Sequence, residues 1–204
     1  MMRIVICRHG NTFDKGDVVT RVGARTDLPL SKSGAAQARQ LAAHFSASDI
    51  VFSEAFCSSL KRTQQTAEAI LTSKHVAKKL KSLQFLTEID YGVDENAAEE
   101  DVVARLGQEA IDKWDRDAIP PRGWQVEPKE IIRAWEKFFE NYRTSNSSGD
   151  ILVATSNGIA RFALDAVDEI ATDAPRKLRT AAYGVIEIEG GISKVKVWDK
   201  RATD

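Results

Sequence analysis

Several features that would assign a class of protein directly are scarce in this sequence. Two cysteines among 204 residues, Cys7 and Cys57, cannot form the disulfide framework of a small secreted domain, which favours a reducing compartment. No segment approaches the roughly 18 consecutive apolar residues of a membrane helix, and the apolar run near Met1 is too short for the core of a signal peptide. We therefore expect a cytoplasmic protein.

Neither sign of charge dominates the chain. The 29 basic and 30 acidic side chains leave a formal net charge of −1. Because nucleic acids and anionic membranes select basic surfaces, neither is expected as a partner. The hydrophobic content of 43% is that of an ordinary globular domain with a sizeable core.

Short apolar runs rich in β-branched residues alternate with helical patterns along most of the chain. Such runs are typical of strands buried on both faces of a parallel sheet. The alternation predicts an α/β fold, a three-layer sandwich with a mostly parallel sheet and helices on both faces. Strands are expected at 4–7, 49–53, 83–86 and 151–154, helices from Ser33 and from about Ser58, and a C-terminal hairpin of 185–189 and 192–198 around Gly190-Gly191.

Residues 90–149 differ in character from the rest. An acidic stretch and a Pro/Gly-rich loop precede a helical pattern, and the region closes on a Ser/Asn/Gly-rich linker at 145–149. We interpret the chain as a single domain, 1–204, with a helical cap insertion at about 90–149 over the functional site.

Arg8, His9 and Gly10 follow the first expected strand. Ligands of open α/β sheets bind beyond the C-terminal ends of the strands. A histidine held there can attack phosphorus through a ring nitrogen, an arginine can hold phosphate oxygens in a bidentate fork, and glycine lets the backbone approach closely. Taken alone, the triplet also fits a buried structural histidine that stands next to a surface arginine.

Two further segments follow the next two expected strands. Arg62 lies near the start of a helix, where the dipole and the free N–H groups favour an anion. Glu88 and Asp90 follow the third expected strand, and a carboxylic acid there could protonate a leaving alcohol oxygen. Each of these residues, taken alone, is also an ordinary surface side chain.

Together these segments resemble the histidine phosphatase superfamily, which includes the phosphoglycerate mutases. The family has an Arg-His-Gly triplet after its first strand, a Ser-x-Leu-x-Arg helix start and an acid before a glycine-containing turn. Here these features are residues 8–12, residues 58–67 and Glu88, and the stretch 24–34 is similar to the family's segment before its first helix. The likeness covers about the first 92 residues and resumes at 150–161.

The resemblance implies a role for each matching residue. His9 would become phosphohistidine, while Arg8 and Arg62 hold the phosphoryl oxygens and neutralise the charge that builds during transfer. Glu88 would act first as general acid toward the leaving group and then as base toward water. Asn11 belongs to the implied phosphate-binding set, with Lys15 as a weaker contact. Neither a metal nor an organic cofactor is implied, since the two arginines supply the charge that a metal would.

The resemblance breaks at the family's second histidine. Aligned on Arg161, Ser156 stands at that position and Asn157 replaces a glycine. Both side chains can donate a hydrogen bond to phosphate, but neither brings a positive charge. His44 and His75 fall in or near helical stretches, away from strand ends, and do not replace it. Losing one preorganised donor typically costs on the order of 10²–10³ in rate, so anion binding should survive better than catalysis.

Three functions follow, of which a phosphatase is favoured. It would act on a phosphomonoester through a phosphohistidine at His9, with a small phosphorylated substrate or inorganic phosphate as ligand. The alternative is a catalytically weak or inactive relative that binds phosphate or a partner. A mutase is least favoured, because Ile89 and Asp90 stand where mutases carry basic residues, and Asp90 would repel an anionic substrate.

The insertion should set the choice of substrate. Trp114 and Trp124 lie near a Pro/Gly-rich loop, and arginines accompany them in the sequence. An aromatic wall with arginines could bind a nucleotide or an aromatic phosphate, although packing within the cap is the preferred interpretation of the tryptophans. The accompanying arginines are Arg105, Arg116 and Arg122.

Overall fold

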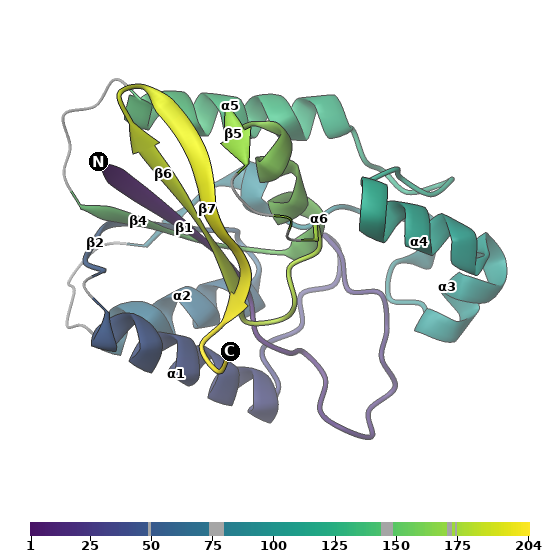
Figure 1. The fold of residues 1–204 in the computed structure, drawn as a ribbon. Coiled ribbons are helices and arrows are strands. Elements are labelled where there is room, and N and C mark those ends of the chain that lie inside the picture. Colours follow the sequence, from purple (N-terminus) through teal and green to yellow (C-terminus); the bar gives the residue numbers. More distant parts are fainter. Residues whose placement is uncertain (49, 74–79, 144–148, 171–172, 174) are drawn as a thin grey trace.

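The computed structural model describes residues 1–48, 50–73, 80–143, 149–170, 173 and 175–204. Within these residues the chain forms one seven-stranded sheet in the order β3-β2-β4-β1-β6-β7-β5, with helices on both faces (Figure 1), which confirms the predicted α/β sandwich. The strands are β1 Met2–Arg8, β2 Phe52–Cys57, β3 Lys81–Ser82, β4 Asp150–Thr155, β5 Glu169–Ile170, β6 Ala182–Glu189 and β7 Ile192–Arg201. The helices are α1 Lys32–Ala47, α2 Lys61–Ser73, α3 Glu99–Leu106, α4 Gln108–Asp117, α5 Pro128–Arg143 and α6 Asn157–Ala160, and the 3₁₀ helices are η1 Gln84–Leu86, η2 Gly92–Asp94 and η3 Arg161–Asp165.

The sheet is parallel on one side of β1, whereas on the other side β6 is antiparallel to both β1 and β7, and β5 pairs in parallel with β7. β1 pairs in parallel with β4, β4 with β2 and β2 with β3. β6 and β7 form the predicted hairpin beside β1, and its turn residues Gly190 and Gly191 have φ of 59° and 81°, which glycine adopts without strain. Since β1, β2 and β4 run in one direction, the residues that follow them meet at one edge of the sheet.

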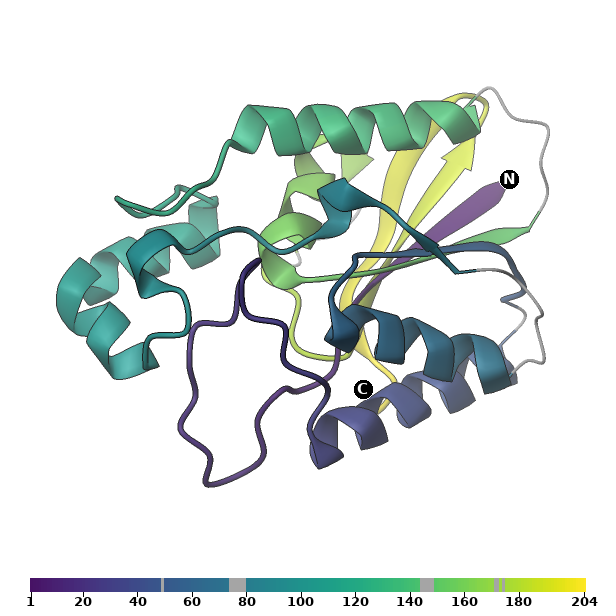
Figure 2. The same cartoon turned by 180° about the vertical axis from the view of Figure 1, so that it is seen from behind.

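Both faces of the sheet are buried, as the uninterrupted apolar runs predict. Along β1, Ile4 and Ile6 belong to one core cluster and Val5 and Cys7 to the other, because successive side chains of a strand point to opposite faces. α1 and α2 cover the face of Val5, while α5 and η3 cover the face of Ile4 (Figures 1 and 2).

Two predicted boundaries are wrong for the same physical reason. Residues 83–86 are not a strand, because β3 ends at Ser82 and the chain turns into η1, where the backbone N–H groups of Leu86 and Thr87 donate to the carbonyl oxygens of Leu83 and Gln84. α2 begins at Lys61 and not near Ser58, because the Ser58 hydroxyl accepts from the backbone N–H of Leu60 and holds that segment in a turn. In both places a local hydrogen bond overrides the apolar pattern.

The second strand is also displaced along the sequence. It was expected at 49–53, but β2 spans Phe52–Cys57, and residue 49 lies outside the described residues. The apolar pattern of Ile50 and Val51 precedes the strand, and Val51 is exposed.

The region predicted as one insertion divides into two parts in the structure. α5 lies along the sheet and buries Trp135 and Phe139 in the core, so it is a layer of the sandwich. α3 and α4 lie beyond the ends of β1 and β4 in both views (Figures 1 and 2). Residues 145–148 of the predicted linker lie outside the described part of the chain. None of the described helices combines the length and the apolar character needed to cross a membrane.

The loop after β1 crosses the first turn of α1 at a point where both segments carry glycine. A Cβ on Gly34 would lie 2.0 Å from the carbonyl oxygen of Asn11, and a Cβ on Gly10 would lie 2.5 Å from the carbonyl oxygen of Gly34. Because the obstacles are backbone atoms, no side-chain rotation can relieve them. This crossing fixes the backbone that follows His9.

We therefore predict that Gly34→Ala lowers the free energy of unfolding by about 1–3 kcal/mol, the scale of an overpacked site. Urea denaturation monitored by tryptophan fluorescence measures the change. Lys32→Ala, at an exposed position of the same helical turn, is the control and should alter stability by less than about 0.5 kcal/mol. Equal stability of Gly34→Ala and the wild type would contradict the tight crossing.

Candidate active site

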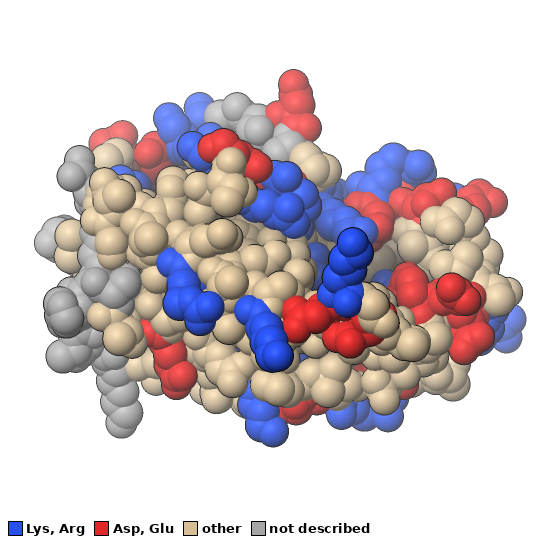
Figure 3. All heavy atoms as spheres, turned by 90° about the horizontal axis from the view of Figure 1, so that it is seen from below, with Lys and Arg blue, Asp and Glu red and all other residues tan. Residues whose placement is uncertain are grey.

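A cavity of about 600 Å³ lies at the C-terminal ends of β1 and β4, between the loop after β1 and the helices α3 and α4. Its walls combine charged, hydroxyl and aromatic side chains. Viewed from below, acidic and basic side chains lie close together in the central part of the molecule (Figure 3). The lining residues include Arg8, His9, Asn11, Lys15, Arg21, Glu88, Tyr91, Glu99, Trp114, Asp115, Asn157 and Lys177.

His9 is almost fully buried, and both of its ring nitrogens are engaged. Nδ1 lies 2.7 Å from the carbonyl oxygen of Gly10, and Nε2 lies 3.2 Å from Nε of Arg62. A carbonyl can only accept and the arginine Nε–H can only donate, so the proton is on Nδ1 and the lone pair is on Nε2. Burial, followed by the charges of Arg62 and Arg8, holds the pKa of His9 well below its ordinary 6.5. The imidazole is therefore neutral at physiological pH, and its unprotonated Nε2 can act as a nucleophile when the hydrogen bond from Arg62 is released.

Arg62 is a buried cation held by three acceptors. Its Nη1 donates to the carbonyl oxygen of Thr26 at 2.9 Å, its Nη2 to that of Gly23 at 3.2 Å, and its Nε to His9. The side chain has no exposed surface and lies behind His9, outside the group of residues that line the cavity. The structure thus brings Arg62 into contact with the predicted nucleophile.

Arg8 and Glu88 both line the cavity. Nη1 of Arg8 donates to the carbonyl oxygen of Leu178 at 2.8 Å, while its buried Nε has no partner within the described residues. The carboxylate of Glu88 accepts from the backbone N–H of Ile89 at 2.9 Å and from that of Gly158 at 3.3 Å. A Cβ on Gly158 would lie 2.2 Å from Oε1 of Glu88, so only glycine allows this approach.

The backbone N–H of His9 donates to the carbonyl oxygen of Thr155 at 3.1 Å. Ser156 and Asn157 follow Thr155 in the chain and therefore lie close to His9. Ser156 is fully buried, and its hydroxyl has no partner within the described residues. Oδ1 of Asn157 accepts from the backbone N–H of Leu178 at 2.9 Å, and the side chain lines the cavity. Because the oxygen of the amide is engaged, its NH₂ group is the part left to donate to a ligand.

The remaining sequence-predicted residues divide between those outside the cavity and those that line it. Asp90 accepts from Arg25 at 2.9 Å and does not line the cavity, so the expected repulsion of substrate by Asp90 is wrong. His44 is hydrogen-bonded to the hydroxyl of Tyr183, and His75 lies outside the described residues. Asn11 and Lys15 do line the cavity.

The predicted combination of Trp114 and Trp124 with Arg105, Arg116 and Arg122 in one wall is not formed. Trp114 and Trp124 are buried and pack edge to face, which agrees with the preferred packing interpretation, although Trp114 also lines the cavity. None of the three arginines lines the cavity: Arg105 pairs with Asp94, Arg116 pairs with Asp117, and Arg122 gives its carbonyl to Arg105.

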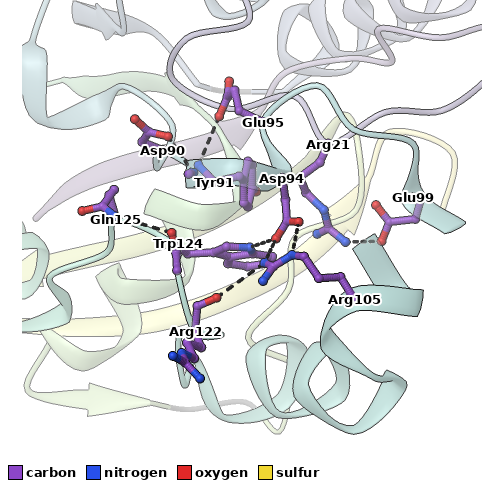
Figure 4. A network of polar contacts seen from close by, with 12 residues as sticks. Arg21, Asp90, Tyr91, Asp94, Glu95, Glu99, Arg105, Arg122, Trp124 and Gln125 are labelled. Atoms are coloured by element: carbon purple, nitrogen blue, oxygen red, sulfur yellow. Dashed lines mark hydrogen bonds and ion pairs between the residues drawn. The ribbon is translucent and has the colours of Figure 1, made fainter. Parts of the chain in front are cut away.

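Sequence reasoning missed Glu95, the residue that holds the loop around Arg62. Its Oε1 accepts from the backbone N–H groups of Gly23 and Arg25, each at 3.0 Å, and from the Thr26 hydroxyl at 2.8 Å. Its Oε2 accepts from the backbone N–H of Tyr91 at 3.1 Å (Figure 4). The carbonyls of Gly23 and Thr26 are the ones that receive Arg62. The only sequence signal was the acidic stretch that contains Glu95.

Arg161 was also missed as a site residue, although the alignment rested on it. It is fully buried, its guanidinium lies 4.0 Å from the ring centroid of Trp114, and it donates to the carbonyl oxygens of Trp114 and Asn157. Its Nη2 lies 3.5 Å from a carboxylate oxygen of Asp115. Arg161 therefore ties α4 of the cap to the start of α6.

The chain belongs to the histidine phosphatase superfamily (branch 1), whose family model matches residues 4–201. It is 32% identical over 130 residues to a 2,3-bisphosphoglycerate-dependent phosphoglycerate mutase of Rhizobium etli, a stretch that covers 60% of this chain and 59% of the relative. Among solved structures it is similar to phosphoglycerate mutase from Bacillus anthracis, with a TM-score of 0.78, 21% identity and coverage of 98% and 93%. It is also similar to α-ribazole phosphatase from Shigella flexneri, with a TM-score of 0.71, 20% identity and coverage of 98% and 97%.

We predict that Glu95→Ala raises the pKa of His9 toward 6.5. Without Glu95, the loop that receives Arg62 loosens, the arginine moves away from Nε2, and part of the charge that disfavours imidazolium is lost. NMR titration of the histidine ring protons measures the pKa. Glu95→Gln keeps one oxygen acceptor and should give a smaller rise, while Glu100→Ala, at an exposed position of α3, should give none. An unchanged pKa in Glu95→Ala would show that the loop holds Arg62 without Glu95.

Proposed function

We propose that this protein is a phosphomonoesterase that works through a phosphohistidine at Nε2 of His9. The observation that carries the proposal is the state of His9: its buried ring is held as the Nδ1–H tautomer, Nε2 keeps its lone pair and accepts from Arg62, and the residue lines the cavity. Arg8, which also lines the cavity, adds a buried Nε that has no partner in the part of the chain that the structure describes. A neutral nucleophile beside two arginines fits attack on a phosphate dianion.

In the first step Nε2 forms a bond to phosphorus as the ester P–O bond breaks. The leaving alkoxide takes a proton from protonated Glu88, whose carboxyl is fixed by Ile89 and Gly158. In the second step a water gives a proton to ionised Glu88 and attacks phosphorus, the P–N bond breaks, and inorganic phosphate leaves. His9 and Glu88 return to their starting states.

The two arginines stabilise the phosphoryl group during both steps. Arg8 offers a buried Nε that has no partner among the described residues. Arg62 can redirect the hydrogen bond of its Nε–H from His9 to a phosphoryl oxygen once the lone pair of Nε2 is used in bonding. Preorganised donors of this kind are usually the largest catalytic contribution. Ser156 and the amide of Asn157 would add neutral donors in place of the family's second histidine.

The relatives support hydrolysis and leave the substrate open. Structures similar to this chain include proteins named α-ribazole phosphatase and phosphoserine phosphatase, the latter from Entamoeba histolytica, while the relative from Rhizobium etli is named a mutase. We assign the phosphatase activity to this chain because Ile89 and Asp90 offer no basic side chain after the acid. The ligand is a small phosphorylated molecule, and the reaction uses the chain's own side chains.

We predict that the wild type hydrolyses an aryl phosphate slowly and that His9→Ala reduces the rate by at least about 10³, as loss of a covalent nucleophile does. Rapid quench followed by mass spectrometry should detect one phosphoryl group on His9. His44→Ala, on α1 and bonded to Tyr183, is the matched control and should keep the rate.

Two outcomes would contradict this proposal in different ways. Activity that persists in His9→Ala would mean that another group is the nucleophile. Phosphate binding without turnover or phosphohistidine would favour the alternative, a phosphate-binding or partner-binding relative.

We predict separately that Asn157→Asp weakens binding of inorganic phosphate by about 10- to 100-fold, the scale of a hydrogen bond to a charged group. The aspartate can still accept from Leu178, but it presents a negative oxygen where the amide presents NH₂. Calorimetry with phosphate measures the affinity. Asn157→Ala removes the donor without adding charge and should give a smaller loss. Equal affinities in wild type and Asn157→Asp would remove Asn157 from the phosphate site.

A further inference from the structure

The cavity wall holds equal numbers of acidic and basic side chains. Among the described residues four carboxylates and four cations line it, and a phosphate dianion would be added to this balance. The carboxylates are Asp14, Glu88, Glu99 and Asp115, and the cations are Arg8, Lys15, Arg21 and Lys177.

Arg21 forms an ion pair with an acidic residue of the cavity wall. Its guanidinium is bonded to the carboxylate of Glu99, and the side chain is only 14% exposed. It also lies 5.4 Å from the ring centroid of Tyr91 and 5.2 Å from that of Trp124 (Figure 4). A guanidinium stacked on two rings and paired with a carboxylate cannot turn toward a ligand without breaking these contacts.

Lys177 also forms an ion pair with an acidic residue of the wall. Its Nζ lies 2.5 Å from a carboxylate oxygen of Asp115, and Asp115 also lies 3.5 Å from Arg161. Of the remaining cations, Arg8 is assigned to the phosphoryl group and Lys15 is exposed, where solvent and salt screen its charge. The wall therefore offers oxygen acceptors and paired cations to the part of the substrate beyond the phosphate.

We propose that the substrate is a phosphomonoester whose alcohol portion carries no carboxylate and is neutral and hydroxylated, or cationic. This inference rests on the proposed function, because it names the substrate class of the same site. Glu99 and Asp115 are the specificity-determining residues. Each compensates the charge of its paired cation and presents an oxygen that accepts from hydroxyl or ammonium groups. A second anionic group on the substrate would face these carboxylates, and apart from Arg8 only the exposed Lys15 among the described lining residues would be left to balance it.

A matched pair of ligands tests the charge of the alcohol portion directly. 3-Phosphoglycerate and the glycerol phosphate of matched configuration share the phosphate, the carbon chain and one hydroxyl, and they differ only in a carboxylate or a hydroxymethyl group. Calorimetry on His9→Ala gives both dissociation constants without turnover. We expect glycerol phosphate to bind about three- to tenfold more tightly, the effect of one partly exposed charge.

The assignment to Glu99 and Asp115 is tested by freeing their cations. In the same background, Glu99→Gln and Asp115→Asn should each shift the ratio of the two constants toward 3-phosphoglycerate by about three- to tenfold. Asp101→Asn, at an exposed position of α3 that does not line the cavity, should leave the ratio unchanged. Because Asp115 also lies near Arg161, Glu99→Gln gives a test that is independent of that buried cation.

Each other outcome overturns a defined part of the proposal. If His9→Ala, with Glu99 and Asp115 unchanged, binds 3-phosphoglycerate as tightly as glycerol phosphate or more tightly, the substrate class is refuted. Binding of inorganic phosphate but of neither ester would refute it as well. An unchanged ratio in both variants would refute the assignment to Glu99 and Asp115. Failure to bind inorganic phosphate at all would overturn the phosphate site and this inference with it, whereas absence of aryl phosphate hydrolysis affects only the proposed catalysis.

Discussion

The buried guanidinium of Arg62 is the interaction on which the site depends. A cation without exposed surface requires hydrogen-bond acceptors, because an uncompensated buried charge is strongly destabilising. Two acceptors are carbonyls of one loop, and the third is His9. Glu95 holds that loop from the far side, at the start of the cap. The charge requirement of a single side chain thus joins the loop after β1, the helix α2, the nucleophile and the cap in one network.

This network fixes the tautomer and the charge of His9, the proposed nucleophile, in the ligand-free protein. The carbonyl oxygen of Gly10 requires a proton on Nδ1 of His9, and the Nε–H of Arg62 requires a lone pair on Nε2, so both hydrogen bonds favour the same tautomer. Burial keeps the ring neutral, so its lone pair is not lost to a proton at physiological pH. The same burial would make an isolated imidazole a poor anion site, and the arginines compensate for that.

Sequence reasoning identified the parts of the site that are local in the chain. Arg8 and His9 follow a strand that an apolar run makes recognisable, and Ser156 follows another, so parallel pairing alone predicts that they meet. Glu95 could not be found in this way, because its partners lie about seventy positions earlier and nothing in their composition marks them. The family resemblance pointed to Glu88 and not Asp90, and the fold agrees, since Asp90 accepts from Arg25 and does not line the cavity. The boundaries at 58–61 and 83–86 were missed because short turns with side-chain or backbone hydrogen bonds are not visible in an apolar pattern.

The loss of the second histidine changes the charge of the site more than its hydrogen bonding. In the proposed mechanism Arg8 and Arg62 carry two positive charges, His9 is neutral and Glu88 supplies a proton, so these side chains would match a phosphate dianion without a further cation. Ser156 and Asn157 replace an imidazolium with neutral donors, which still satisfy oxygens but add no charge as electrons accumulate on the leaving group. The burden of the first step then moves to the proton that Glu88 supplies. An enzyme of this kind is expected to favour esters whose alcohols leave easily and to depend on the protonation state of that carboxyl more strongly than a relative with two histidines.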